Sequence, residues 1–307
     1  MQSNCSKKCA AGSPCGDCSL CSAAVDVAKE AALVIAPGER RAAPVLLPVA
    51  EKVSVDIGAG AEVSLLESAV GPACAGVEQT ELTITLAEGA SVRLVSMREC
   101  AAHGQRAYHS RFTLDKSAKL KVIECRLGGG NISSSAVVDL AGEEASVEFM
   151  SALFAAETDQ LLSDININHF ASRSTSRIIT KCVLADAARI KYRGLVHIAR
   201  DTCGCVGEQR ADALLVSSRA RADLMPDLKI DANDVRCSHG STISGLDEHK
   251  LYYLMSRGLS RSSAMNAAAR GFMATVLGGL DESEAEAVER ILAPRLKCAL
   301  TTLDEVA

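Results

Sequence analysis

The sequence has few aromatic residues, no tryptophan and no long apolar run. Aromatic residues make up only 3% of the 307 residues, so Val, Ile, Leu and Ala must fill the core. The longest apolar runs, 31–36 and 42–50, fall well short of the roughly 20 residues that a membrane-spanning helix needs. Lys7 and Lys8 precede a polar, cysteine-rich segment rather than the apolar core of a signal peptide, which predicts a cytoplasmic protein.

Basic residues are not in excess either, and nucleotide motifs are missing. The formal net charge is −5, and no basic block or basic stripe with aromatic residues occurs, which argues against nucleic acid as a partner. Gly128–Gly130 lacks the Lys and Ser/Thr of a Walker A loop, and no GxGxxG fingerprint is found. The sequence therefore predicts no nucleotide site of its own.

Cysteine, in contrast, is abundant and clustered. Five of the 13 cysteines fall in the first 21 residues, and disulfides rarely persist in a reducing compartment, so the cluster indicates metal or redox chemistry. A Cys-x2-Cys-x2-Cys run can wrap three sulfurs around one centre, as in iron–sulfur ligation, and zinc accepts the same thiolates. We expect residues 1–22 to form a metal-binding head; a flexible redox-sensitive tail is the alternative. The candidate ligands are Cys5, Cys9, Cys15, Cys18 and Cys21.

A helix and a linker are predicted over residues 23–48. Apolar residues with helical spacing favour a short helix over about 22–35, stopped by Pro37 and Gly38. A proline-punctuated stretch, 44–48, then leads to the main body.

The main body, 49–240, contains a repeat of strand signals. In each copy an apolar residue is followed four positions later by Ala, and then by apolar residues at alternate positions. Neighbouring copies lie about 22 to 32 residues apart if the gap from Leu140 to Leu184 hides one degraded copy. This spacing favours a β-solenoid whose coils stack on one another, and an antiparallel sandwich is the alternative. The copies begin at Ile57, Leu86, Leu114, Leu140 (with one inserted residue), Leu184 and Val216.

Residues 241–307 are predicted to form a helical domain. Asp247 can cap a helix that runs to about Arg257, and Ser260 can cap a second that runs to about Leu277. A third helix is expected from about 282 to 300. The predicted architecture is thus mainly β, with helical ends.

Two short motifs near the end of the β body carry further chemistry. Cys203 and Cys205 form a Cys-x-Cys pair, and Cys237 and His239 lie two apart on an extended segment, so their side chains point the same way. The second pair can bind a metal or form a Cys/His nucleophile. An enzyme is the weaker interpretation, because no oxyanion loop or substrate pocket is evident.

The region around Cys237 resembles a known family. Residues 226–244 read PDLKIDANDVRCSHGSTIS, followed by LDE at 246–248 and LYYLMSRG at 251–258. These segments closely resemble the signature of the SufB/SufD family, the scaffold subunits of the Suf iron–sulfur cluster assembly machine. The specific match covers about residues 190–280, and the β body is compatible with the family from about residue 45.

The resemblance implies a fold and partners. It implies a right-handed parallel β-helix with helical ends, in which two scaffold subunits pair near the C-terminal end of the solenoid. It also implies that the helices over about 247–277 dock a SufC-type ATPase, whose closure drives cluster assembly, so the chain itself need not be an enzyme. A sulfur donor and apo iron–sulfur proteins would be further partners. The residues expected to contact the ATPase are Leu251, Tyr252, Tyr253, Met255 and Arg257.

The residues expected to form the cluster site match the family motifs only in part. Cys237 and His239 match the SufD form of the motif, whereas SufB has a glutamate where this chain has Gly240. The SufB scaffold cysteine aligns with Ala211, so we expect Cys203 and Cys205 to replace it.

At 307 residues the chain resembles the compact single-scaffold form of minimal Suf-like systems, which homodimerises. Cys203, Cys205, Cys237 and His239 of two chains would then assemble one iron–sulfur cluster. A SufD-like structural subunit that assists iron entry without holding the cluster is the alternative.

Overall fold

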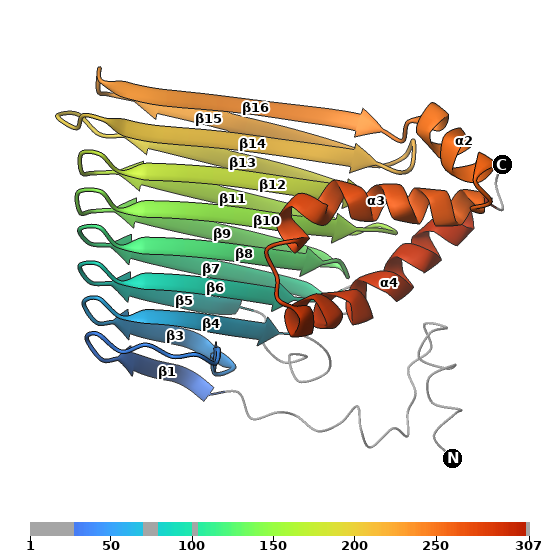
Figure 1. The fold of residues 1–307 in the computed structure, drawn as a ribbon. Helices are drawn as coiled ribbons and strands as arrows, with labels where there is room; N and C mark the ends of the chain where they lie inside the picture. Colours follow the sequence, from blue (N-terminus) through green and yellow to red (C-terminus); the bar gives the residue numbers. More distant parts are fainter. Residues whose placement is uncertain (1–27, 70–78, 100–103, 305–307) are drawn as a thin grey trace, which may run out of the picture.

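The chain folds as a stack of two-stranded coils (Figure 1). The computed structural model describes residues 28–69, 79–99 and 104–304. Strands with odd numbers form one eight-stranded sheet, sheet A: β1 (Ala28–Ile35), β3 (Ala50–Ile57), β5 (Gln79–Leu86), β7 (Gln105–Leu114), β9 (Asn131–Leu140), β11 (Gln160–His169), β13 (Arg189–Ile198) and β15 (Arg221–Ile230). Strands with even numbers form sheet B: β2 (Val45–Leu46), β4 (Glu62–Ala69), β6 (Ser91–Arg98), β8 (Lys119–Leu127), β10 (Ser146–Ala155), β12 (Thr175–Leu184), β14 (Cys205–Leu215) and β16 (Val235–Gly245).

The predicted solenoid is confirmed, and the antiparallel sandwich is wrong. Each strand pairs in parallel with the strand one coil away, so equivalent residues stack directly above one another. The spacing also agrees: 22 residues separate Ile35 from its partner Ile57, and 32 separate Ile198 from Ile230. Alternate residues point inward, which explains the period of two in the sequence.

The degraded copy in the gap after Leu140 exists. His169 stacks on Leu140, and Ser174 and Ser176 occupy the positions that Ala145 and Val147 hold one coil below. The copies that begin at Leu184 and Val216 lie at the other corner of the coil, where sheet B leads back to sheet A. The repeat found in the sequence therefore mixed copies from the corner between sheets A and B with copies from the opposite corner, where sheet B returns to sheet A.

The turns from sheet A to sheet B stack as regularly as the strands. Each of these turns except the last, 231–234, has a left-handed residue that faces the next turn, for example Gly89 (φ 68°) and Gly204 (φ 66°). Its N–H donates to a carbonyl of the next coil, as Arg173 N does to Cys203 O at 2.8 Å. This hydrogen-bond ladder fixes the turn end of the stack.

The helix expected over 22–35 is wrong for the residues that the structure describes. Residues 28–35 form strand β1, which pairs in parallel with β3. Leu33 and Ile35 point toward the interior, while Val34 lies 69% exposed. Because alanines accompany them, the same residues also fit a helical period, and only the pairing with β3 decides between the two.

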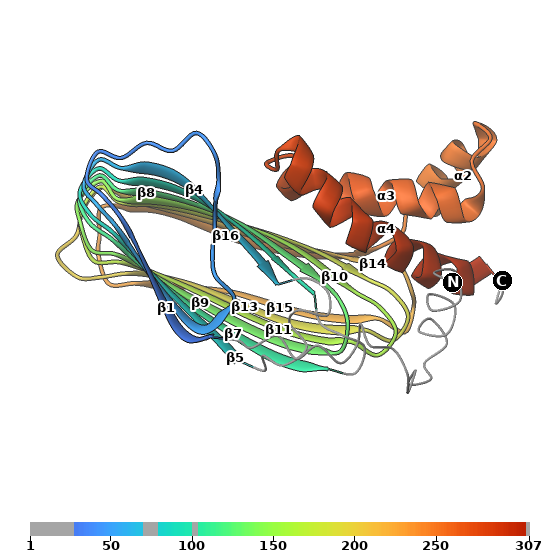
Figure 2. The ribbon, with the colours of Figure 1, turned by 90° about the horizontal axis from the view of Figure 1, so that it is seen from below.

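The predicted C-terminal helices are confirmed. They are α2 (Glu248–Ser256), α3 (Arg261–Leu277) and α4 (Glu282–Asp304), and Asp247 and Ser260 cap the first two through their side chains. The helices lie over the outer face of sheet B (Figure 2), where a second apolar cluster forms between them and the strands. The β body extends beyond the expected limits of 49 and 240, because β1 begins at Ala28 and β16 ends at Gly245.

Candidate functional site

The last coil of the solenoid, β15 and β16, is uncapped in the described structure. These strands are the final members of sheets A and B, and no described strand pairs with their outer edges. Their inward residues, among them Leu224 and Leu228, are only half-buried, and Ile230 and Ile243 are 40% and 49% exposed. An edge of this length with apolar side chains favours pairing with another chain.

Cys237 and His239 lie on the inner face of this last coil. Cys237 stacks on Gly207 and His239 on Gln209, and both lower residues belong to the buried face of β14. The expectation that the two side chains share one face is confirmed. Cys237 is half-buried and His239 is exposed, because no coil lies above them in the described structure.

Gly207 lies directly beneath Cys237 in the stack and contacts its sulfur. A Cβ atom at Gly207 would lie 3.4 Å from Cys237 Sγ and 2.9 Å from Val196 Cγ1. Burial raises the pKa of the Cys237 thiol, while the backbone N–H of Gly207 acts in the opposite direction. A side chain at position 207 would therefore clash with Val196 first, while its Cβ would touch the Cys237 sulfur at an ordinary contact distance.

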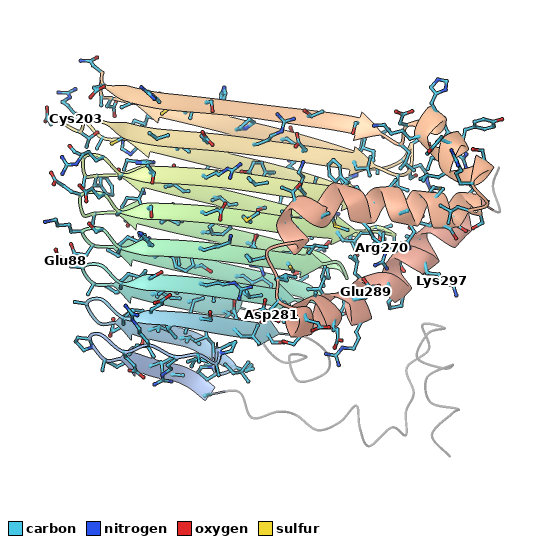
Figure 3. All side chains as sticks on the ribbon, in the orientation of Figure 1. Glu88, Cys203, Arg270, Asp281, Glu289 and Lys297 are labelled. Carbon is cyan, nitrogen blue, oxygen red and sulfur yellow. The ribbon has the colours of Figure 1, made fainter. Side chains whose placement is uncertain are left out.

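Cys203 and Cys205 do not act as a convergent pair. Cys203 lies at the turn end of the stack, on the same side as Glu88 (Figure 3), with its sulfur 3.6 Å from Ser172 Oγ. Cys205 opens β14, is completely buried and points into the solenoid. Gly204, with its left-handed φ, turns the chain between them, so the period of two that would align the sulfurs is broken.

Cys205 adjoins a buried polar cluster that the sequence did not predict. His169 Nδ1 lies 2.8 Å from Ser174 Oγ, and His169 Nε2 lies 2.8 Å from Ser176 Oγ. Ser174 Oγ lies in turn 3.5 Å from Cys205 Sγ. Burial lowers the pKa of His169 to about 4, so the ring is neutral near pH 7. The degraded repeat was the signal that could have revealed this cluster.

Further polar residues line the interior below His239. Gln209 donates to the Tyr192 hydroxyl at 3.1 Å, and its buried Oε1 has no hydrogen-bond partner among the residues that the structure describes. Gly194 allows this arrangement, because a Cβ there would lie 1.7 Å from Gln209 Nε2. Ala211, which the resemblance aligns with the family thiol, is completely buried between Thr180 and Ser241 in the stack.

The four cluster candidates of one chain do not form a metal site by themselves. Within the described residues, no group of three or more His, Cys, Asp or Glu side chains is arranged to hold a metal ion. The predicted head ligands Cys5, Cys9, Cys15, Cys18 and Cys21 lie outside the described residues.

The predicted ATPase contacts lie on α2 and at its C-cap, Arg257, and most of them are exposed. Tyr252 and Tyr253 are 74% and 58% exposed and Met255 is 38% exposed, and Arg257 stacks 5.2 Å from the Tyr253 ring centre. Leu251 is buried against the other helices and cannot contact a partner directly.

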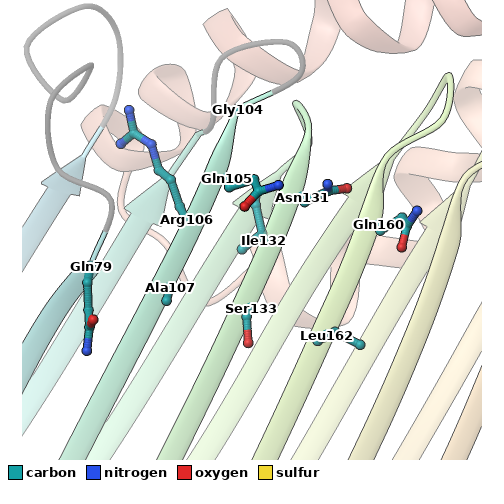
Figure 4. Close-up of a pocket in the computed structure, with 10 residues that line it drawn as sticks. All are labelled: Gln79, Gly104, Gln105, Arg106, Ala107, Asn131, Ile132, Ser133, Gln160 and Leu162. Atoms are coloured by element: carbon teal, nitrogen blue, oxygen red, sulfur yellow. The ribbon is translucent and has the colours of Figure 1, made fainter.

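A wide groove elsewhere on the described surface does not coincide with these thiols. It lies on the outer face of sheet A, and Figure 4 shows Gln79, Gln105, Asn131 and Gln160 along it. Among the described residues that line it there is no cysteine or histidine, and the amides offer no soft metal ligand.

Comparison with known proteins identifies the family of the chain. Residues 42–272 match the family model described as "SUF system FeS cluster assembly, SufBD core domain". The chain belongs to the SufBD core family. This finding confirms the predicted family, and the match includes Cys203, Cys205, Cys237, His239 and α2.

Individual SufBD proteins are distant relatives. A SufBD family protein of Mycobacterium leprae is 29% identical over 211 residues, which are 69% of this chain and 24% of the relative. The SufD protein of Escherichia coli strain K12 is 25% identical over 227 residues, which are 74% of this chain and 54% of SufD. A SufBD family protein of Staphylococcus saprophyticus is 24% identical over 216 residues, which are 70% of this chain and 46% of the relative. The chain thus spans from about a quarter to about half of these relatives.

None of the helices in the described part of this SufBD chain is both long and apolar enough to cross a membrane.

Proposed function

We propose that this SufBD chain is a homodimeric scaffold on which an iron–sulfur cluster is assembled. The observation that carries the proposal is the uncapped last coil, which presents Cys237 and His239 on its inner face above the buried Cys205. Membership of the family described by the SUF cluster-assembly model supports this role.

A second copy of the chain is the natural cover for the open edge. Strands β15 and β16 are 10 and 11 residues long and offer free backbone hydrogen-bonding groups along their outer edges. Pairing of two such ends buries the half-exposed apolar residues and brings Cys237 and His239 of both chains together. Two thiols and two imidazoles suit iron, because both ligand types bind it.

Cys205 needs an opening of the last coil before it can bind the cluster, since its sulfur is completely buried. The energy for this opening is proposed to come from a SufC-type ATPase that docks on α2. The exposed Tyr252 and Tyr253 offer an aromatic contact surface, and the Arg261–Glu248 ion pair at 2.6 Å fixes α2 to α3. The chain itself then supplies ligands rather than catalysis.

A SufD-like role without a cluster is the second candidate. It is favoured by Ala211, which places no sulfur at the position of the SufB scaffold cysteine, and by the divergence of Cys203 and Cys205. In that case the same edge would pair with a different scaffold chain.

The proposal is tested by anaerobic reconstitution with iron and sulfide, followed by Mössbauer spectroscopy and iron and zinc analysis. The forms compared are the full chain, a chain without residues 1–22, and the single variants Cys205→Ser and Cys237→Ser. Cys298→Ser is the matched control, because this exposed thiol lies on α4.

We expect the truncated chain to retain a cluster and the Cys205 and Cys237 variants to lose it. If all iron is lost with residues 1–22, the thiols of the solenoid are not the scaffold, and the head is the metal module. Zinc bound only to the full chain would assign the head as a zinc site.

A further inference from the structure

The interior of the solenoid changes from apolar to polar one coil below the proposed cluster ligands. At the turn end the lower coils stack apolar residues in three columns, and the coil of β11 and β12 breaks all three. In the first column Ser174 follows Ala145, in the second Ser176 follows Val147, and in the third His169 follows Leu140. A polar break in an otherwise consistent core is expected where function overrides packing.

The break leads directly to Cys205 and Cys237. Cys205 continues the column of Ser174, and the column of Ser176 continues through Gly207 to Cys237. The three polar side chains are almost completely buried: the exposed fraction is 0% for His169 and Ser174 and 3% for Ser176. They are bonded to one another and to the Ala171 carbonyl, so they do not depend on water.

The proton positions in the cluster follow from its geometry. Ser174 Oγ lies 2.7 Å from the Ala171 carbonyl, which can only accept, so the single hydroxyl proton of Ser174 points there. His169 Nδ1 must then carry a proton and donate to Ser174 Oγ. Since the ring is neutral, His169 Nε2 accepts the proton of Ser176. In this series of hydrogen bonds Ser176 donates to His169, and His169 donates to Ser174.

Ser174 can redirect its proton to Cys205. The sulfur lies 3.5 Å from Ser174 Oγ, 3.5 Å from the Ala171 carbonyl and 3.8 Å from the Cys203 carbonyl, so a neutral thiol donates to one of these oxygens. A negatively charged sulfur, as in a metal-bound thiolate, repels the carbonyl but accepts from a hydroxyl. Rotation of the Ser174 hydroxyl from the Ala171 carbonyl to the sulfur supplies that donor. It leaves the hydrogen bonds of His169 with Ser174 and Ser176 intact.

We propose that Ser176, His169 and Ser174 are positioning residues that aim a polarised hydroxyl at the Cys205 sulfur and stabilise it as a ligand. Hydrogen bonds to ligand sulfurs from such an outer shell tune metal affinity and reduction potential. This inference deepens the proposed function and rests on Cys205 being a ligand.

The test measures the reactivity of Cys205 in the metal-free full chain. Iodoacetamide alkylates thiolates, and peptide mass spectrometry gives the rate for each cysteine. Cys203, exposed at the turn, reports the activity of the reagent. Cys182, completely buried with a pKa that burial raises, reports opening of the solenoid, so the ratio of the Cys205 rate to the Cys182 rate is the readout.

The variants are Ser174→Ala, Ser174→Thr and His169→Leu. Ala and Leu are the residues of the coil below, so both variants suit the fold. Ser174→Ala removes the hydroxyl nearest to the sulfur and should lower the Cys205 ratio at pH 7 about threefold to tenfold, because the loss of thiolate outweighs its gain in nucleophilicity. Ser174→Thr keeps the hydroxyl and should retain most of the reactivity, and His169→Leu should give an intermediate loss.

An unchanged Cys205 ratio in Ser174→Ala would overturn the inference and leave the cluster as a self-contained part of the core. A loss in Ser174→Thr equal to that in Ser174→Ala would overturn it too, because the hydroxyl would not be the cause. Since no iron is present, either result is independent of the reconstitution of Cys205→Ser, which alone decides whether Cys205 is a ligand.

Discussion

Arg93 on β6 donates two hydrogen bonds, of 2.8 and 2.6 Å, to the carboxylate of Glu284 in the first turn of α4, 191 residues away. Arg93 also donates to the Gly279 carbonyl at 2.9 Å, in the connection between α3 and α4. Glu284 is 3% exposed, and its hydrogen bonds raise the pKa of Arg93. This one side chain thus fixes the start of α4 to the solenoid.

Loss of the Glu284 charge should destabilise the helical layer. In Glu284→Gln the Arg93 guanidinium keeps its place without a charged partner, and we expect the free energy of unfolding to fall by about 2–3 kcal/mol. Urea unfolding followed by circular dichroism measures the change. Glu286→Gln, an exposed change in the same helix, should have an effect below about 0.5 kcal/mol. Equal effects of the two variants would contradict the anchoring role of Glu284.

His169 should make the stability of the chain sensitive to mild acid. Its pKa is about 4 when folded, below the value of about 6.5 in an unfolded chain, so the unfolded state binds the extra proton more readily. The neutral ring therefore favours the folded state above about pH 6.5, and this contribution is lost as the pH falls toward 4.

His169→Leu cannot titrate, so its stability relative to the natural chain should increase by about 3 kcal/mol between pH 7 and pH 4. Thermal and urea unfolding at several pH values measure this difference. His249→Gln, at an exposed position, is the control. A difference between His169→Leu and the natural chain that does not vary with pH would contradict a buried neutral His169.

A charge on the inner face of the open coil should prevent dimerisation. Ser241 points inward from β16, stacked on Ala211, while Ser238 on the same strand points outward. Ser241→Lys places an ammonium group in the proposed interface, and we expect sedimentation velocity to report a monomer. Ser238→Lys has the same charge and should remain dimeric. If both variants dimerise, the open end is not the interface.

The aromatic pair on α2 should decide ATPase binding. Tyr252 and Tyr253 are largely exposed, so replacing both by Ala should leave the fold intact while removing their contact area. We expect affinity for a SufC-type ATPase, measured by calorimetry, to fall at least tenfold. Lys250→Ala on the same helix should bind normally. Unchanged binding of the double variant would place the docking surface elsewhere.

The repeat and the helix caps could be predicted from the sequence because both follow local rules. Inward residues of a stacked coil recur at fixed spacing, and Asp247 and Ser260 cap their helices through their own side chains. Strand β1 could not be predicted in this way, because alternation and helical spacing coincide in an alanine-rich segment. Its state depends on the partner strand β3, 22 residues away.

The site was only partly predictable for the same reason. Cys237 and His239 share a face because a strand fixes their relation, whereas Cys203 and Cys205 diverge because Gly204 adopts a left-handed turn. The cluster around His169 combines residues of β11, a turn, β12 and β14. The sequence indicates that one copy of the repeat is degraded, but it does not show which polar side chains of that coil meet one another and Cys205.

The position of the helices has a mechanical consequence. In a simple repeat array each coil touches only its neighbours, so the ends fray independently of the middle. Here α3 packs on β10 and β12, α4 packs on β8, and Arg93 ties the start of α4 to β6. These helices act as a brace across the coils of β6 to β12, so these coils should unfold as one cooperative unit. A force applied at α2 would then reach the thiol-bearing coils and the lower coils at the same time.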